Sequence, residues 1–186
     1  MKLLLAILLM PFMVTAQVNS VFVSKSKLSY PRLEYCGDGL FGFEQDGKIG
    51  YMNADQKVII KPTLDLKLTT SDRIPAFTNG FAVIKLNGKQ GLIDKTGKQV
   101  VPCEYNSLMS EKSSKTLLRV SKYENYKTTY GVLTTQNKLV IPIEYASIII
   151  DGNLVAVKKD TKWGLMDAAG KELIPPTYST FQLYAE

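Results

Sequence analysis

The stretch at residues 158–181 reads KKDTKWGLMDAAGKELIPPTYSTF, and it is the cleanest copy of a unit that recurs along the chain. Two polar breaks, at residues 160–162 and 167–171, separate three short apolar runs. The second break contains a glycine, which suits a tight turn, and Pro175 and Pro176 end the last run because proline cannot donate to a β-ladder. This pattern predicts a three-stranded antiparallel β-meander.

Three less perfect copies precede this one, and two columns of residues define them. A glycine stands in the second apolar run of every copy: Gly50, Gly91, Gly131 and Gly164. Eleven positions further on stand Lys61, Pro102, Pro142 and Pro175. A period of about 33–41 residues is typical of arrays in which each unit packs on its neighbours. The chain is therefore expected to be an all-β, solenoid-like tandem array of three-stranded meander repeats.

On this alignment the chain divides into six segments. They are a signal peptide at 1–16, an N-terminal cap or partial repeat at 17–38, repeat 1 and its connection at 39–79, repeat 2 and its connection at 80–115, repeat 3 at 116–151, and repeat 4 with the C-terminus at 152–186. The cap is weakly patterned, with one candidate strand at residues 18–23, because terminal repeats are often atypical. In repeat 3 the first turn is expected to be enlarged by about four residues, compared with a two-residue hairpin loop, within YENYKTT at 123–129.

Residues 1–16 have the pattern of a secretory signal peptide. Lys2 precedes an apolar run at residues 3–14, and Val14-Thr15-Ala16 fits the small-x-small cleavage pattern before Gln17. The run is too short to cross a bilayer, which takes about 20 apolar residues. We therefore expect a secreted or periplasmic protein with no membrane span after cleavage.

The run KWGLMDAAGKELIPPTY at residues 162–178 resembles the WG-repeat (KWG) family, and the resemblance extends over residues 39–181. The earlier copies depart from it where the last has tryptophan, at Ile49, Gln90 and Tyr130. The resemblance implies β-rich binding or interaction modules. It implies no reaction, cofactor or catalytic residue for the repeat.

The second turn of each repeat is the other place where the copies differ. Its glycine is replaced by Gln56 in repeat 1 and by Asn137 in repeat 3. Asparagine adopts the left-handed conformation more readily than glutamine, so the turn of repeat 1 is expected to differ from the others. Asp94 and Asp167 begin this turn in repeats 2 and 4, where aspartate is expected to cap its own backbone.

The composition gives little support to catalysis. The chain has no histidine, which removes the commonest general base and the commonest metal ligand. Its acidic residues are scattered rather than set at ligand spacing, so neither a metal nor another cofactor is predicted. Glu104 and Glu144 occupy equivalent repeat positions, which repetition explains better than glycoside hydrolysis does. The expectation is a non-catalytic protein, and a carbohydrate-active enzyme with clustered carboxylates is the alternative.

Two columns of the alignment hold aromatic residues. One contains Tyr105, Tyr145 and Tyr178, and the other contains Tyr130 and Trp163. Such rings either pack between units or form a stacking platform for sugar rings and peptide side chains. We take these five residues as the candidate ligand-binding set, with an envelope protein or glycan as the expected partner.

The formal net charge is +6, and lysines recur after both turns of the unit. They are Lys48, Lys89, Lys127 and Lys162 after the first turn, and Lys57, Lys98, Lys138 and Lys171 after the second. Lysine rows either protect exposed strand edges or attract an anionic envelope surface. Nucleic acid is not an expected partner for an exported protein.

The chain has two cysteines, Cys36 and Cys103. In an oxidising compartment two cysteines can pair. Cys103 stands where other repeats have Pro62, Ile143 and Pro176, so it fills a repeat position without needing a partner. The sequence leaves pairing open.

Overall fold

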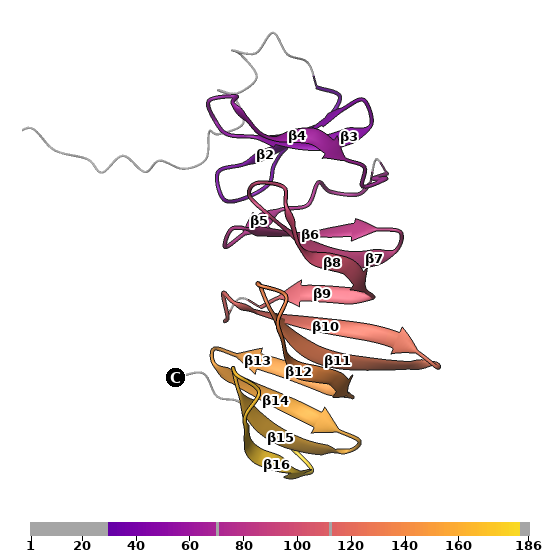
Figure 1. Cartoon of the computed structure of the whole chain (residues 1–186), viewed down its shortest axis with the longest axis vertical. Helices are drawn as coiled ribbons and strands as arrows, with labels where there is room; N and C mark the ends of the chain where they lie inside the picture. Colours follow the sequence, from indigo (N-terminus) through magenta and orange to yellow (C-terminus); the bar gives the residue numbers. More distant parts are fainter. Residues whose placement is uncertain (1–29, 70, 112, 183–186) are drawn as a thin grey trace, which may run out of the picture. The chain divides into compact units, whose positions relative to one another are not determined.

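The computed structural model describes residues 30–69, 71–111 and 113–182. The expected signal peptide at 1–16 and the candidate strand at 18–23 lie outside these residues. The described residues contain β-strands and no helix, and the strands form four antiparallel sheets of four strands each (Figure 1). In each sheet the strands are paired in chain order, and no sheet closes on itself.

The first sheet contains β1 (Leu33–Tyr35), β2 (Phe41–Gln45), β3 (Lys48–Met52) and β4 (Val58–Leu64). The second contains β5 (Phe77–Thr78), β6 (Phe81–Leu86), β7 (Lys89–Asp94) and β8 (Gln99–Tyr105). The third contains β9 (Ser107–Ser110), β10 (Leu117–Glu124), β11 (Lys127–Thr134) and β12 (Leu139–Tyr145). The fourth contains β13 (Ser147–Asp151), β14 (Leu154–Lys159), β15 (Lys162–Asp167) and β16 (Glu172–Tyr178).

The expectation of three-stranded meanders was wrong by one strand per repeat. The predicted three strands are present in each sheet, and β1, β5, β9 and β13 are added to them at one edge. These added strands are short, and β9 and β13 follow the preceding sheet after the single residues Asn106 and Ala146. The bend there is stabilised by backbone hydrogen bonds, from Asn106 N–H to Ser121 O (2.9 Å) and from Ala146 N–H to Lys158 O (2.8 Å).

The column glycines lie where the closing strand bulges toward them. Trp163 pairs with Tyr178, and the next pair is Leu165 with Ile174. One residue of β15 therefore lies opposite three residues of β16. A Cβ atom on Gly164 would lie 2.7 Å from the carbonyl oxygen of Ile174. The other sheets have the same register step and the same close approach, at Gly50, Gly91 and Gly131. The prolines of the closing strands fall in these bulges, where no ladder N–H is required.

The second turn has one conformation in all four sheets, contrary to the expectation for repeat 1. Gln56 has a positive φ of 64°, as do Asn137 and the equivalent glycines Gly97 and Gly170. In every sheet a side-chain oxygen at the start of the turn accepts two backbone N–H bonds, at Asn53, Asp94, Thr134 and Asp167. The predicted capping by Asp94 and Asp167 is therefore confirmed. Because this acceptor organises the turn in repeat 1 as well, Gln56 adopts the left-handed conformation despite its lower tolerance.

The insertion in repeat 3 lengthens strands instead of enlarging a turn. Pairing between β10 and β11 continues to Glu124 and Lys127, and the loop is the two-residue turn Asn125-Tyr126. Both turn residues have positive φ, 50° and 60°, as a type I′ hairpin requires. The hairpin therefore extends further than its equivalents, as the long β10 and β11 arrows show (Figure 1).

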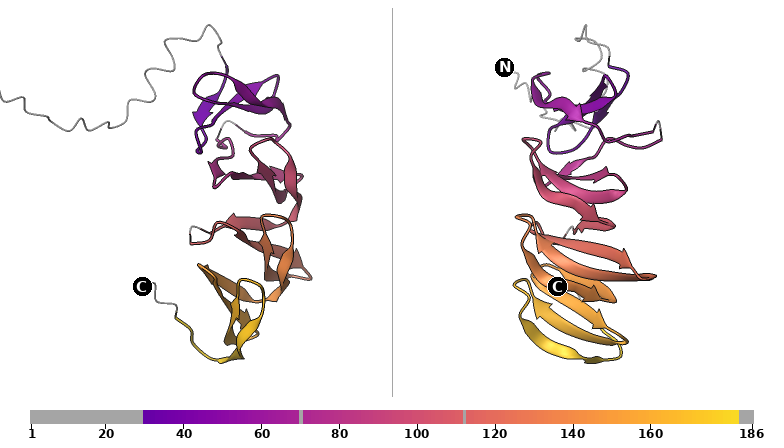
Figure 2. Two further views of the ribbon diagram at one scale, coloured as in Figure 1. Left: turned by 60° about the vertical axis from the view of Figure 1, so that its left-hand side comes forward. Right: turned by 45° about the vertical axis from the view of Figure 1, so that its right-hand side comes forward.

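Three apolar cores lie between consecutive sheets, which follow one another in chain order (Figure 2). The first joins residues of sheets one and two, including Tyr51, Ile60 and Ile84. The second joins sheets two and three through Val101 and Leu118, and the third joins sheets three and four. Each of these three cores draws on two sheets, so neighbouring repeats stabilise one another.

Candidate functional site

The two aromatic columns lie side by side across each sheet. Trp163 of β15 pairs directly with Tyr178 of β16, and Tyr130 of β11 pairs with Tyr145 of β12. Directly opposed residues of an antiparallel pair present their side chains on the same face. The structure therefore brings the predicted candidates together in two pairs, and in the second sheet Tyr105 pairs with Gln90.

The five candidates differ in exposure. Tyr105 and Tyr145 are 5% and 6% exposed and belong to the cores between sheets, so they offer no free ring face to a ligand. Burial, with Glu104 beside it, raises the pKa of Tyr105 to about 12, and burial also raises the pKa of Tyr145. Tyr130 and Trp163 are half-buried, and Tyr178 is 56% exposed.

The next sheet along the chain accounts for this difference. The Lys122 ammonium of the third sheet lies 5.8 Å from the centre of the Tyr105 ring of the second. Tyr145 packs in the core that the third sheet shares with the fourth. Tyr178 lies in the last closing strand, and within the described residues no further sheet follows it. The same repeat position is thus core in two sheets and surface in the fourth.

The Trp163 side chain has charged and aromatic neighbours on its face of the fourth sheet. Lys158 is its cross-strand partner in β14, and the Lys158 ammonium lies 5.6 Å from the indole centre. The Phe181 ring stacks against the indole with centroids 6.4 Å apart and planes 28° apart. We call Lys158, Trp163, Tyr178 and Phe181 the aromatic row.

An open hollow of about 500 Å³ adjoins the aromatic row. It is lined by Trp163, Ser179, Thr180, Phe181 and Gln182. The hydroxyl of Ser179 accepts a hydrogen bond from the Lys162 ammonium, 2.9 Å away. The hollow therefore combines ring faces with hydroxyl and amide groups, which are the groups that fix a sugar or a peptide side chain.

Gln90 explains how a polar residue fits the tryptophan column. Its amide oxygen accepts the backbone N–H of Leu108 in the third sheet at 2.7 Å. In the first sheet the same column holds Ile49, which is 2% exposed. The residues of the tryptophan column are therefore neither all buried nor all exposed. Their exposure depends on the contacts that the neighbouring sheet makes with each of them.

The repeated lysines lie at both ends of every sheet. One begins each third strand, and the other precedes each closing strand across the second turn. All eight are exposed except Lys89, which is half-buried and donates to the Asn106 side chain at 2.9 Å. Within the described residues none of the eight has an ion pair. The positive charge is thus distributed along the array.

The repeated glutamates, Glu104 and Glu144, are both exposed. Glu144 forms an exposed ion pair with Lys159, 3.0 Å away. Glu104 occupies the equivalent place in the preceding sheet. Residues 30–69, 71–111 and 113–182 contain no cluster of three or more His, Cys, Asp or Glu that is placed to hold a metal ion. The same residues contain no helix long and apolar enough to cross a bilayer.

Both cysteines are free thiols. Cys36 is buried beside β1, where burial is the main cause that raises its pKa to about 11. Cys103 is half-buried in the β8 bulge, and burial raises its pKa as well. The pairing that the sequence left open is therefore absent from the folded chain.

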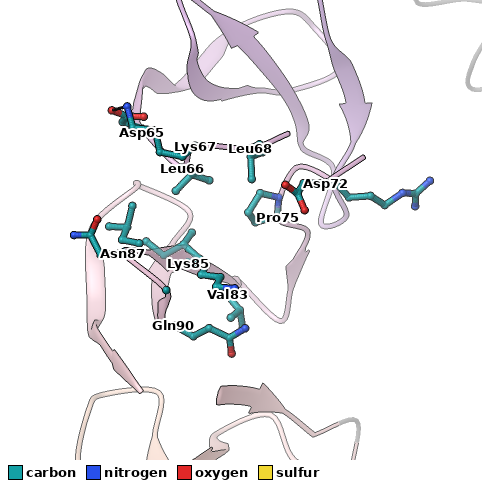
Figure 3. Close-up of a pocket in the computed structure, with 14 residues that line it drawn as sticks. Asp65, Leu66, Lys67, Leu68, Asp72, Pro75, Val83, Lys85, Asn87 and Gln90 are labelled. Carbon is teal, nitrogen blue, oxygen red and sulfur yellow. Dashed lines mark ion pairs between the residues drawn. The ribbon is translucent and has the colours of Figure 1, made fainter. Parts of the chain in front are cut away.

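A further cavity lies where the sequence indicated only a connection between repeats. It has a volume of about 770 Å³ and lies between residues 65–68 and 72–75 on one side and the β6–β7 hairpin on the other (Figure 3). The connection is fixed to the first sheet, since Tyr51 Oη donates to Pro75 O (2.9 Å) and Arg32 Nη1 donates to Thr69 O (3.2 Å). No motif marks this site, because it arises from how two consecutive sheets are joined.

Comparison with known proteins identifies the repeat. A family profile described as "WG containing repeat" matches residues 49–89, 91–126, 130–163 and 163–186. No curated protein matches the chain. Among solved structures, the crystal structure of TolB from Acinetobacter baumannii aligns at 14% identity with a TM-score of 0.33, over 74% of this chain and 40% of that chain. The family matches cover most of the sequence and recur with the sheets, so this chain belongs to the WG containing repeat family and carries four repeats.

Proposed function

We propose that this chain is a non-catalytic binding protein of the bacterial cell envelope, and that it binds a glycan through the aromatic row of its fourth sheet. The observation that carries the proposal is the exposure of Tyr178 next to Trp163, at a position that is core in the preceding two sheets. An aromatic pair left open beside a hollow is a common platform for a sugar ring.

The charges around the row favour an acidic glycan. Lys158 lies over the Trp163 ring, and Lys162 lies at the edge of the hollow through its bond to Ser179. Ammonium groups at these places would attract carboxylate or phosphate groups on the ligand. The formal net charge of +6 acts in the same direction over a longer range.

A carbohydrate-active enzyme is the alternative at this surface. It would need two carboxyl groups about 5–9.5 Å apart beside the bound sugar. The residues that line the hollow carry no carboxylate, which supports binding over hydrolysis. Release of reducing sugar by the purified protein would contradict the proposal.

Trp163 is the single tryptophan, so its fluorescence reports this site directly. We expect acidic envelope oligosaccharides to change its emission and to protect it from iodide quenching. Trp163→Ala should weaken binding by about tenfold or more, and Tyr178→Ala by less, while Tyr123→Ala, an exposed tyrosine in the third sheet, should leave it unchanged. A glycan array and a pull-down from envelope extract identify the ligand. Retention of an envelope protein, with no glycan response, would contradict the glycan proposal and indicate a protein partner.

Export belongs to the same proposal and has its own test. If residues 1–16 are removed as a signal peptide, the mature chain begins at Gln17. The intact mass of the protein recovered from the periplasm or the medium should equal that of residues 17–186. A mass that retains Met1, or a protein confined to the cytoplasm, would contradict the envelope location.

A further inference from the structure

The second sheet lacks most of its first strand. β5 has two residues, which pair Phe77 with Ala82 and Thr78 with Phe81. The equivalent strands β1, β9 and β13 pair over three, four and five residues. Residues 83–86 of β6 therefore have a strand on one side only, where β7 lies.

Backbone hydrogen bonds show the same gap. In each sheet one residue of the second strand pairs with the tryptophan column. In three sheets this residue has a backbone hydrogen bond on the side away from that column: Glu44 N–H donates to Arg32 O, Ser121 O accepts from Asn106 N–H, and Lys158 O accepts from Ala146 N–H. Lys85 is the equivalent residue, because it pairs with Gln90. Among the described residues no backbone bond links the outer edge of Lys85 to another segment. Alternate residues direct their backbone groups to the same edge, so Lys85 has an unpaired donor and acceptor there. Val83 has an unpaired acceptor, because the pairing of Phe77 with Ala82 directs the Val83 N–H toward Ala76.

The cavity of about 770 Å³ described above occupies this gap. Its walls include residues 83–88 on the hairpin side and Leu66, Leu68 and Pro75 on the connection side (Figure 3). Its volume of about 770 Å³ falls within the range of ligand sites, about 300–1,000 Å³. Three consecutive residues, at about 3.3 Å each, would span the unpaired stretch from Lys85 to Val83.

We propose that this groove binds an extended peptide segment of a partner protein, which pairs antiparallel with β6 and completes the second sheet. The ligand residue opposite Lys85 exchanges backbone hydrogen bonds with it, as Ser107 does at the equivalent place of the third sheet, and the next ligand N–H but one donates to the Val83 carbonyl, at the place of Met109. In the other three sheets the residue equivalent to Ile84 pairs with an apolar residue of the first strand: Leu33, Leu108 or Ile148. The ligand therefore has an apolar residue at its centre, on the face where Leu66 packs with Ile84.

The charges of the groove specify an acidic residue next to the apolar one. Asp65 forms an ion pair with Lys67 at 2.9 Å, and Asp72 accepts two bonds from Thr69. Lys85, Arg73 and the Asp72 carboxylate have no ion pair within the described residues. Because two unpaired cations outweigh this one unpaired carboxylate, an aspartate or glutamate opposite Lys85 would be attracted to the groove.

The chain itself supplies a suitable probe. A fluorescein-labelled peptide with blocked ends is made from residues 105–111, YNSLMSE, with Ser107→Asp to place an acid opposite Lys85. The full-length protein should raise its fluorescence polarisation saturably. A control peptide that also carries Met109→Pro should bind at least tenfold more weakly, because proline removes an N–H that pairs with β6.

Charge reversal tests the register. Lys85 is exposed, so Lys85→Glu should leave the fold intact and weaken the acidic peptide about three- to fivefold. A peptide with Ser107→Lys should bind the Lys85→Glu variant better than the unaltered protein. The matched control Lys98→Glu, an exposed lysine of the same sheet outside the groove, should change neither affinity.

Amide hydrogen exchange gives the backbone readout. Binding of the probe should slow exchange at Lys85 and leave Tyr130 and Trp163 unchanged. Equal binding of the proline peptide, or no protection at Lys85, would overturn the proposal. Protection that rises with protein concentration without peptide would overturn it in favour of a second copy of the chain. The groove is separate from the aromatic row, so a negative glycan result leaves this proposal standing, and the reverse is also true.

Discussion

At the residue scale, the four column glycines are required by what lies opposite them. A Cβ on Gly91 would lie 2.5 Å from the carbonyl oxygen of Val101 and 2.8 Å from the nitrogen of Cys103. Both are backbone atoms, which cannot rotate away as a side chain can. The tryptophan position one residue earlier has no such constraint, and it holds four different residues in the four repeats.

We expect Gly91→Ala to destabilise the protein by about 1–3 kcal/mol, the usual cost of overpacking. The free energy of unfolding from denaturant titration measures the effect. Gly88→Ala is the matched control, because a Cβ there meets nothing within 4 Å and the cost comes only from its positive φ of 78°, about 1 kcal/mol. A smaller loss for Gly91→Ala than for Gly88→Ala would contradict the close approach at the bulge.

The two thiols should react at different rates. Cys36 is 1% exposed and its raised pKa, about 11, leaves almost no thiolate at pH 8, whereas Cys103 is half-buried. A thiol reagent at pH 8 should therefore modify Cys103 first, and the rate at Cys36 should rise with pH toward 11. Mass spectrometry of the labelled protein over time distinguishes the sites. Faster labelling of Cys36, or a disulfide-linked product in native protein, would contradict the structure.

At the scale of the strand and turn, local chemistry made part of the fold predictable. Asp46-Gly47 and Asn87-Gly88 form the hairpin turns that their sequences predict, with positive φ at each residue. Two added strands were missed because β5 has two residues and β9 reads SLMS, too short and too polar to give a strand pattern. β13 reads SIIID and has an apolar pattern, but it follows β12 after one residue, so its start as a separate strand of the next sheet was not marked by a turn signal. Their pairing depends on the following strand of the same sheet, which periodicity within a short window does not reveal.

The β10–β11 hairpin provides a test of turn chemistry. Tyr126 occupies the second position of the turn with φ of 60° and is 97% exposed, where two other hairpins have glycine. Tyr126→Gly should therefore stabilise the protein by about 0.5–1 kcal/mol, since it relieves the left-handed strain and loses no packing. Thermal unfolding should show a higher midpoint. A lower midpoint would mean that the tyrosine ring makes a stabilising contact.

At the scale of the whole array, each core is shared by two consecutive sheets, and this determines which candidates stay accessible. Sequence alignment placed Tyr105, Tyr145 and Tyr178 at one position, but it could not show that the first two are covered and the third is open. The cover comes from residues of the next sheet, such as Lys122 over Tyr105. The groove beside β6 was unpredictable for the same reason, because it depends on how one sheet is connected to the next.

Removal of the fourth sheet should disrupt the third. Deletion of residues 147–186 would expose Val132, Ile141 and Tyr145, which the two sheets now bury together. We expect the truncated chain to bind a hydrophobic dye and to lose its cooperative thermal transition, because the repeats are not independent. A truncated chain that melts as sharply and at as high a temperature as the full chain would show that the third sheet folds without the fourth.

The glycine and bulge pairing has a consequence for protein engineering. The close approach at the bulge depends on the glycine having no side chain, and it does not depend on the residue beside the glycine. The tryptophan position can therefore vary without changing the backbone, and it holds a different residue in each of the four repeats. A combinatorial library is therefore best restricted to Lys158, Trp163 and Tyr178, which are half-buried or exposed and lie outside the cores between sheets. Randomising the equivalent row of the second or third sheet would instead select mainly for folding, because there the tyrosine is part of a core.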